Sequence, residues 1–225
     1  MTRSIAMVGM ACIVLAISDS TRAVDDLPVE KNEPLSIGRV LPDFESVTDA
    51  GQPWKLADYV GHKVLVFYFY PGDFTGGCIK QAQSFREGLK SLKDLDIEVI
   101  GVSGDEVATH RLFKQSHGLT HTLLADYEGA LAAQLGIPAR RQDVPAKVRA
   151  IGLDRKPLVD EQDKPIIVER KVTFLRWTIV IDREGKLVSK RMQVNPATDA
   201  DDVRKIVESL TIGAQNASRA DGVSK

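Results

Sequence analysis

The chain has 225 residues, and only two of them are cysteines, Cys12 and Cys78, which excludes a small scaffold held together by disulfides. Thirty lysines and arginines against 31 aspartates and glutamates give a net charge of -1, so the chain has no basic field that would concentrate nucleic acid. Hydrophobic residues make up 43% of the sequence, which is enough to build the core of one globular domain.

The first 23 residues have the layout of a secretory signal peptide. Arg3 is followed by an uncharged and largely apolar run over 4–18, and Ala23 is the small residue at the predicted cleavage site. The run is shorter than the roughly 20 apolar residues that cross a bilayer, which favours a cleaved signal over the alternative, an uncleaved membrane anchor. Cleavage would place the protein in the periplasm or outside the cell. It would also remove Cys12 and leave Cys78 as the one cysteine.

A polar segment with two prolines, residues 24–36, is predicted to be a flexible lead-in to a domain over 37–212. A weak strand is expected over 43–47. The strongest strand is expected over 63–70, where branched and aromatic residues fill both faces, as in a central strand buried on two sides. After residues 75–77, apolar residues at intervals of three and four predict a helix that runs to about residue 95.

Strands and helices continue to alternate after this helix. The predicted elements are a strand over 97–103, a helix over 105–117, a strand over 122–125 and a helix over 129–135. Asp105 is expected near the N-cap of its helix, and Gly118 is expected to end it. This alternation predicts parallel strands joined by helical crossovers, and therefore an α/β domain with a central mixed sheet flanked by helices.

Residues 138–171 interrupt the alternation with four prolines and a charged stretch. Such a segment is either an excursion from the sheet or a partner-binding loop, and the sequence leaves both open. A strand over 173–182, a tight turn and an antiparallel strand over 186–193 follow. An amphipathic helix over 198–210 completes the domain, and small polar residues predict a disordered tail over 213–225.

Cys78 lies where the strongest strand gives way to a helix. In the first helical turn, unpaired backbone N–H groups and the positive end of the helix dipole favour the thiolate, which is the nucleophile, over the thiol. Thr75 can offer its hydroxyl to the sulfur or to a bound oxygen, and Pro71, which lacks an N–H, can shield the site from water. The alternative, a free cysteine that packs as a small hydrophobe, is disfavoured by this position.

The spacing Pro71-x-x-x-Thr75-x-x-Cys78 resembles the active-site motif of the peroxiredoxins. The match extends to the flanking residues 70–75 and 82–86, where the chain is similar to the branch called bacterioferritin comigratory protein or peroxiredoxin Q. The resemblance implies a thioredoxin-like fold and a thiol-dependent peroxidase that needs neither a metal nor an organic cofactor.

The resemblance also implies an arginine on a later strand, which holds the thiolate and polarises the peroxide. Arg176 is the candidate because it precedes an apolar strand, as the family's arginine does, although Trp177 stands where the family has a small hydroxyl residue. Arg170 is the fallback, and Arg140 and Arg141 are more remote alternatives.

In the mechanism that the resemblance implies, peroxide converts Cys78 to a sulfenic acid, which a second thiol must reduce. Many members of the branch have a resolving cysteine five residues after the first, but this chain has Gln83 there, and it has Gln81 where the branch often has Glu. We therefore predict a one-cysteine enzyme for hydrogen peroxide or alkyl hydroperoxides. Its reductant would be an external thiol, either a thioredoxin-like protein or a small thiol.

The other partners follow from composition and resemblance. No nucleic acid is expected, nor any membrane after cleavage of the signal, and a homodimer is left open. His117 and His121 are predicted to be packing or surface residues, because no further ligands complete a zinc set.

Two rival functions stand beside the peroxidase. A thiol-disulfide exchanger would need Cys-x-x-Cys, and position 81 is Gln. A non-catalytic redox sensor or binding module would use Cys78 only to report oxidation to a partner. The joint presence of Pro71, Thr75 and Arg176 disfavours that reading.

Overall fold

The computed structural model describes residues 35–221, so the predicted signal peptide and nearly all of the predicted lead-in lie outside the described residues. Its centre is a five-stranded sheet in the order β5-β4-β3-β8-β9. The middle strand, β3 (Val64–Phe69), is buried at all six positions, which confirms the two-sided burial that its sequence predicts. None of the helices in the described part of the chain is long and apolar enough to span a membrane.

The sheet is mixed because β3 pairs in parallel with β4 (Ile97–Ser103) and antiparallel with β8 (Trp177–Ile181). Strand β5 (Thr122–Ala125) extends the parallel side, and β9 (Leu187–Arg191) extends the antiparallel side. The limits of β4 and β5 are those that the sequence predicts. The predicted α/β class with a central mixed sheet is confirmed.

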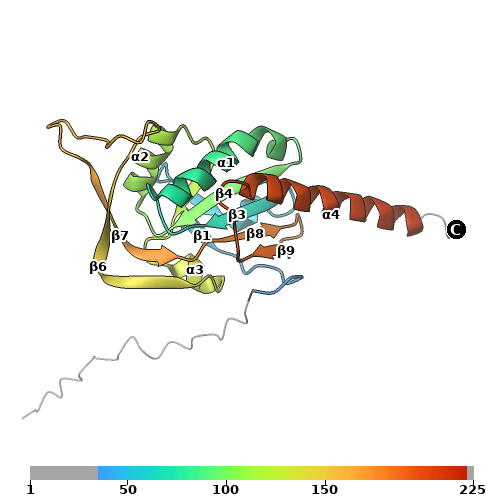
Figure 1. Cartoon of the computed structure of the whole chain (residues 1–225). Coiled ribbons are helices and arrows are strands. Elements are labelled where there is room, and N and C mark those ends of the chain that lie inside the picture. The colour runs from blue at the N-terminus through green and yellow to red at the C-terminus, as the bar shows by residue number, and fades with distance from the viewer. Residues whose placement is uncertain (1–34, 222–225) are drawn as a thin grey trace, which may run out of the picture. The chain divides into compact units, whose positions relative to one another are not determined.

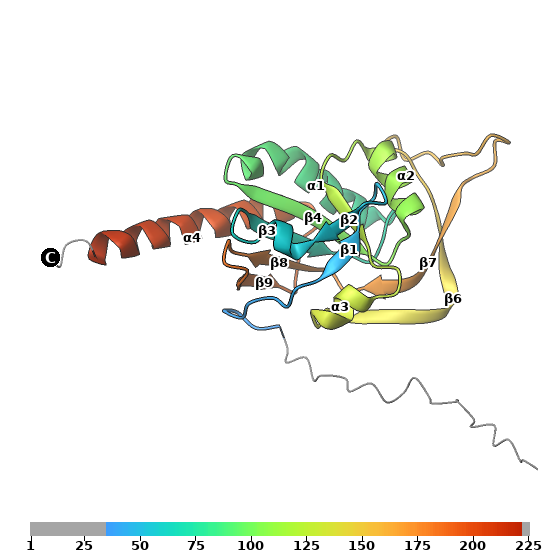
Figure 2. The ribbon, with the colours of Figure 1, turned by 180° about the vertical axis from the view of Figure 1, so that it is seen from behind.

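Helices α1 (Gly76–Lys93) and α4 (Asp199–Asp221) lie side by side on one face of the sheet (Figure 1). Figure 2 views the structure from behind, where the smaller elements lie. These are the hairpin of β1 (Glu45–Val47) and β2 (Pro53–Lys55), the 3-10 turn Leu56–Asp58 and helix α3 (Ala130–Gln134). Helix α2 (Val107–His117) packs beside β5.

Alternation along β3 divides the apolar core into two clusters. Val66 and Tyr68 belong to the cluster that contains Phe85 of α1 and Val203 of α4. The alternate residues of β3, whose side chains point to the other face, belong to the second cluster, where Phe67 packs edge-on against Trp54 of β2. Burial of each large side chain stabilises the fold by about 1.5–3 kcal/mol, so both layers hold β3, and with it the start of α1, in place.

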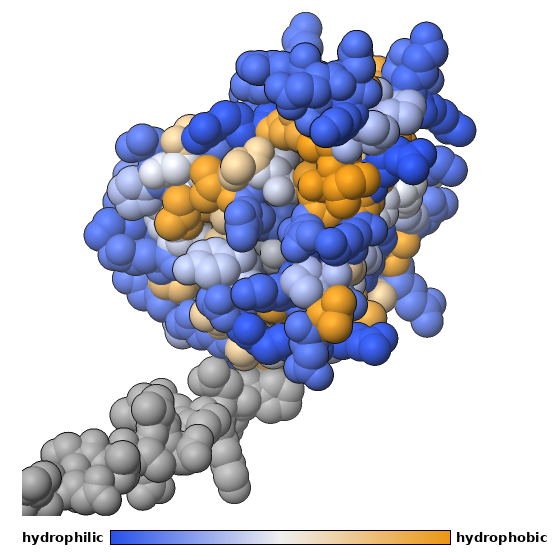
Figure 3. Space-filling model, turned by 90° about the vertical axis from the view of Figure 1, so that its left-hand side faces the viewer, coloured by the Kyte–Doolittle hydropathy of each residue, from blue (hydrophilic) through white to orange (hydrophobic). Residues whose placement is uncertain are grey.

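The proline-rich segment is an excursion from the sheet that forms its own hairpin. Strand β6 (Ala139–Arg149) pairs antiparallel with β7 (Ile167–Phe174), and the two make a separate two-stranded sheet. On the side of the protein that Figure 3 views, apolar side chains gather in patches among charged ones. The exposed apolar residues of the segment are Val144, Leu153, Val159 and Ile167.

Several predicted limits differ from the observed ones by one or two residues, and two of the differences have a long-range cause. The helix expected over 105–117 begins at Val107, and Asp105 does not cap it but lies fully buried in an ion pair. The strand expected over 173–182 is interrupted at Leu175 and Arg176, between β7 and β8. In both places a contact with a distant part of the chain overrides the local pattern, because Asp105 pairs with Arg170 and Arg176 bonds to Cys78.

The end of the chain also differs from its prediction. The helix expected over 198–210 runs to Asp221, so the disordered tail expected from residue 213 is corrected for 213–221. Several alanines in this stretch have high helix propensity, which continues the helix beyond its last apolar position. Residues 222–225 lie outside the described residues.

Candidate active site

Cys78 is the third residue of α1, and Thr75 is the residue immediately before the helix. The cysteine is 1% exposed. The carbonyl of Thr75 accepts the N–H of Ile79 over 2.9 Å, which starts the helical hydrogen bonds around the sulfur. At this position the free N–H groups of the first turn and the helix dipole stabilise a negative charge on sulfur.

Arg176 donates from Nη2 to Sγ of Cys78 over 3.2 Å. The antiparallel register pairs Phe69 at the end of β3 with Trp177 at the start of β8. This pairing brings Arg176 to the end of β3 from which the chain continues into α1. Gly77 leaves room for the guanidinium, since a Cβ there would lie 3.2 Å from Nη2. The structure thus places the candidate arginine, and not its fallback, against the sulfur.

A polar chain holds the other side of the Arg176 guanidinium. Nη1 donates to Oε1 of Gln81, and Nε2 of Gln81 donates to Asp199 over 2.7 Å. Asp199 also accepts from Thr178 over 2.7 Å and from Arg191 over 2.6 Å. Burial raises the pKa of Asp199, and the hydrogen bonds from Thr178 and Gln81 oppose that rise. The sequence flagged Gln81, but it gave no signal for Asp199, which resembles an ordinary residue of the first turn of α4.

Thr75 and Pro71 lie on the segment that leads to Cys78. The Thr75 hydroxyl donates to the carbonyl of Gly72 over 3.1 Å, and within the described residues it makes no hydrogen bond to the sulfur. Pro71 is half-buried just after β3. The catalytic roles expected for these two residues stay predictions.

The remote arginine candidates lie away from the sulfur. Arg140 and Arg141 are exposed on β6, and Arg141 pairs with Glu128 at the surface. Neither contacts Cys78 in the described part of the chain.

A second polar cluster holds the segment before Thr75. Arg170 donates from Nε to Asp105 over 2.8 Å and from Nη2 to the carbonyl of Asp73 over 3.0 Å. Asp105 accepts the N–H of Asp73 over 2.8 Å, and the Asp73 carboxylate accepts the Tyr70 hydroxyl and contacts Nδ1 of His110, each at 2.8 Å. Burial opposes a charge on His110, but the Asp73 carboxylate beside it raises the His110 pKa above its usual value. Sequence reasoning missed this cluster because its members are far apart along the chain.

The two histidines weighed as zinc ligands are both buried core residues. Nε2 of His121 lies 2.7 Å from the Tyr68 hydroxyl, and Nε2 of His117 lies 3.0 Å from the carbonyl of Ile151. Burial lowers the His121 pKa to about 3. Among residues 35–221, no group of three or more His, Cys, Asp or Glu side chains could hold a metal ion.

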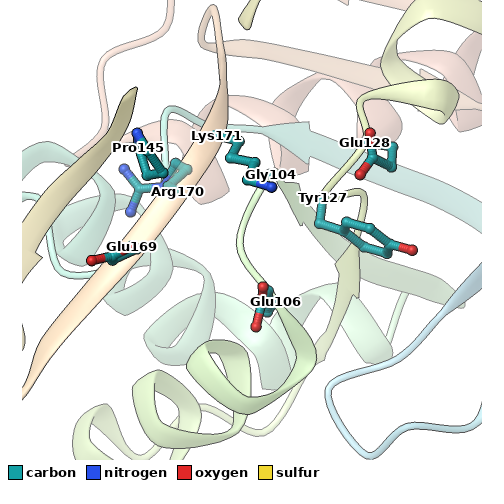
Figure 4. Close-up of a pocket in the computed structure, with 8 residues that line it drawn as sticks. All are labelled: Gly104, Glu106, Tyr127, Glu128, Pro145, Glu169, Arg170 and Lys171. Carbon is teal, nitrogen blue, oxygen red and sulfur yellow. The ribbon is translucent and has the colours of Figure 1, made fainter. Parts of the chain in front are cut away.

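A pocket of about 170 Å³ opens between the hairpin and the start of α2 (Figure 4). It is lined by Gly104, Glu106, Tyr127, Glu128, Pro145, Glu169, Arg170 and Lys171. Cys78 does not line it. The pocket is therefore separate from the sulfur, and it shares Arg170 with the cluster that holds the segment before Thr75.

Comparison with known proteins decides the family, because the profile of the AhpC/TSA family matches residues 37–190. The chain belongs to this family. The peroxiredoxin Bcp of Bacillus subtilis (strain 168) is 37% identical over 139 residues, which cover 61% of this chain and 87% of the relative. The chloroplastic peroxiredoxin Q of Oryza sativa subsp. japonica is 40% identical over 105 residues, and this match covers 47% of the chain and 48% of that relative.

Solved peroxiredoxin structures share the fold. Peroxiredoxin Q from Xanthomonas campestris superposes with a TM-score of 0.55 and 25% identity, covering 74% of this chain and 90% of that one. Peroxidoxin BcpB from Mycobacterium tuberculosis does so with a TM-score of 0.61 and 24% identity, covering 78% and 97%. The chain is thus a peroxiredoxin, a thiol-dependent peroxidase with a thioredoxin-like fold, which confirms the family that the motif around Cys78 predicted.

Proposed function

We propose that this peroxiredoxin reduces hydrogen peroxide or alkyl hydroperoxides through Cys78 alone, and that a thiol of another molecule returns it to the reduced state. The observation that carries the proposal is the 3.2 Å contact between Arg176 and the Cys78 sulfur at the start of α1. Among the described residues, Cys78 is the free cysteine. This arrangement supplies a stabilised thiolate and a cationic donor, but no partner sulfur.

In the first step the Cys78 thiolate attacks one oxygen of the peroxide. A sulfur–oxygen bond forms, the oxygen–oxygen bond breaks, and the leaving hydroxide or alkoxide takes up a proton to depart as water or alcohol. The sulfur is oxidised to a sulfenic acid and the peroxide is reduced. Arg176 and the N–H groups of the first helical turn stabilise the negative charge as it moves from sulfur to the leaving oxygen.

In the second step an external thiol attacks the sulfenic sulfur. Water leaves and a mixed disulfide forms, and a second thiol then displaces Cys78 as a thiolate. Position 83 on α1 is a half-buried glutamine, so this helix offers no second sulfur there. A thioredoxin-like protein or a small thiol fits the role of reductant.

The test is consumption of hydrogen peroxide by the protein lacking residues 1–23, with dithiothreitol as the reductant. Cys78→Ser should abolish turnover, and equal rates for the two proteins would contradict the proposal. A sulfenic-acid probe should label Cys78 after one equivalent of peroxide. Labelling without turnover would favour the rival reading of a redox sensor.

Export of the protein with removal of residues 1–23 belongs to the same proposal. It removes Cys12, so that Cys12 cannot serve as a second thiol for Cys78. N-terminal sequencing of the protein recovered from the producing cells should begin at Val24. A recovered protein that retains Cys12 would contradict the export step and would supply a second cysteine.

A further inference from the structure

Strand β7 has one charged residue among its inward-facing side chains. Exposed and buried residues alternate along it, and the buried ones are Val168, Arg170, Val172 and Phe174. Arg170 is 4% exposed at a position where an apolar side chain is the rule. Figure 4 shows that Arg170 and its neighbour Lys171 extend in different directions from the strand. A cation held this deep needs partners that offset its lost hydration.

Arg170 and its partner Asp105 hold the backbone of Asp73 at two points. Its Nη2 donates to the carbonyl of Asp73 over 3.0 Å, and its Nε pairs with Asp105 over 2.8 Å. Asp105, which is also fully buried, accepts the N–H of Asp73 over 2.8 Å. The backbone of Asp73 is therefore fixed at both its N–H and its carbonyl, and one of the two contacts comes from the hairpin itself.

The residues on either side of Asp73 show how closely this grip fits the backbone. A Cβ on Gly72 would lie 1.8 Å from Cζ of Arg170, so the guanidinium packs directly on the glycine. Phe74 has a φ of 60°, a left-handed conformation that a bulky residue keeps only when its surroundings impose it. The Thr75 hydroxyl then donates to the Gly72 carbonyl, which connects the held backbone to the residue that begins α1.

We propose that Arg170 is a positioning residue for the peroxidase reaction. Through this side chain, the hairpin fixes the backbone of residues 71–75 and with it the position of Thr75 and of the first turn of α1. The inference rests on the proposed function. Arg170 does not touch the sulfur, so its loss should slow peroxide attack equally at every pH.

Two variants remove the grip in different ways. Arg170→Lys keeps the buried charge, but its single nitrogen cannot replace both the Nε and the Nη2 contacts. The double variant Arg170→Met with Asp105→Leu removes both charges, so that no unpaired ion is left in the core. Lys171→Met, an exposed position on the same strand, is the matched control.

Two measurements on the folded proteins decide the proposal. The first is the rate constant for peroxide attack across the pH range, which both Arg170 variants should lower by about tenfold to a hundredfold without moving the midpoint of the pH profile. The second is hydrogen exchange of residues 71–78, which should be about tenfold faster in both variants. Lys171→Met should match the wild type in both.

Wild-type values in either measurement for the Arg170 variants would overturn the proposal, as would a shift in the midpoint of the pH profile. Failure of the wild type to consume peroxide would instead contradict the proposed function. Hydrogen exchange at 71–78 does not depend on peroxide and would still decide whether Arg170 holds the segment.

Discussion

Arg170 and Arg176 are six residues apart in the sequence, and they lie against opposite ends of the segment 72–77 that leads to Cys78. Each guanidinium packs on a glycine, Gly72 for Arg170 and Gly77 for Arg176. Their partners differ. Arg170 is buried and forms an ion pair with a carboxylate, whereas the half-buried Arg176 bonds to the neutral amide of Gln81 and to the sulfur.

The difference shows how one residue type serves two purposes at one site. A guanidinium whose charge is already matched by Asp105 orders the backbone and has little attraction left for another anion. In the described part of the chain, Arg176 forms no ion pair with a carboxylate, so its charge is available to a thiolate and to the oxygen that leaves it. The partner of each arginine, and not its distance from the motif along the chain, decides its role.

The largest effect should come from removing the cation that touches the sulfur. Arg176→Met should slow peroxide attack about a hundredfold to a thousandfold, the usual cost of losing a donor to a developing charge. Stopped-flow kinetics measures the rate constant, with the exposed Arg140→Met as the control. A loss of less than about fivefold would assign the chemistry to other groups.

The next effect tests the contact between Arg170 and Gly72 by changing the glycine. Gly72→Ala places a methyl group into the Arg170 guanidinium and should lower the free energy of unfolding by about 1–3 kcal/mol. Urea denaturation measures the loss. Gly61→Ala is the matched control, since Gly61 also has a positive φ but a Cβ there has no other atom within 4 Å. Equal stability of the two variants would show that Arg170 can leave Gly72 freely.

A smaller effect should follow from giving Arg176 the carboxylate that Arg170 has. Gln81→Glu keeps an acceptor for Nη1 but adds a negative charge near the sulfur and beside Asp199. Peroxide attack should slow by about tenfold, because the added carboxylate competes with the substrate oxygens for the charge of Arg176. Gln83→Glu makes the same charge change elsewhere on α1 and should have little effect. A wild-type rate for Gln81→Glu would contradict the role assigned to the neutral amide.

The smallest effect concerns the pH dependence of stability that arises from His121, a buried residue that contacts neither arginine. The folded pKa of His121, about 3, lies below its unfolded value near 6.5, so protons bind the unfolded chain preferentially and stability falls as the pH drops. Between pH 7 and 5.5 this histidine should account for about 1 kcal/mol of lost stability.

Replacement of this histidine tests the assignment. Denaturation at the two pH values should show that His121→Gln loses less stability than the wild type on acidification. The exposed His62→Gln should behave like the wild type. An unchanged acid response in His121→Gln would show that the buried ring takes up its proton in the folded state.

Most of the fold could be predicted because its strands are apolar and bounded by turn residues. Strands β4 and β5 have their predicted limits, and helix α1 ends within two residues of its predicted end. The hairpin was harder to predict because prolines obscure the pairing of its strands and because β7 carries Arg170 at an inward position, which breaks the apolar alternation.

Prediction of the site succeeded where a local motif exists and failed where contacts are long-range. Cys78 and Arg176 follow from short sequence patterns, and the structure brings the two together. Asp105 has the position of a helix cap, and nothing in its neighbourhood shows that it faces Arg170, which lies 65 residues further along the chain. A buried ion pair is a property of two segments at once, so a reading of either segment alone assigns its residues to the surface.

The ion pair between β7 and the core has a consequence for how this protein could have changed over time. An added surface segment can usually be lost again without harm, since loops tolerate changes in length. Loss of Arg170 from this hairpin would instead leave the carboxylate of Asp105 buried without its cation, which costs about 3–5 kcal/mol. Positions 105 and 170 are therefore expected to be gained and lost together, as one inherited unit that spans the domain and its insertion.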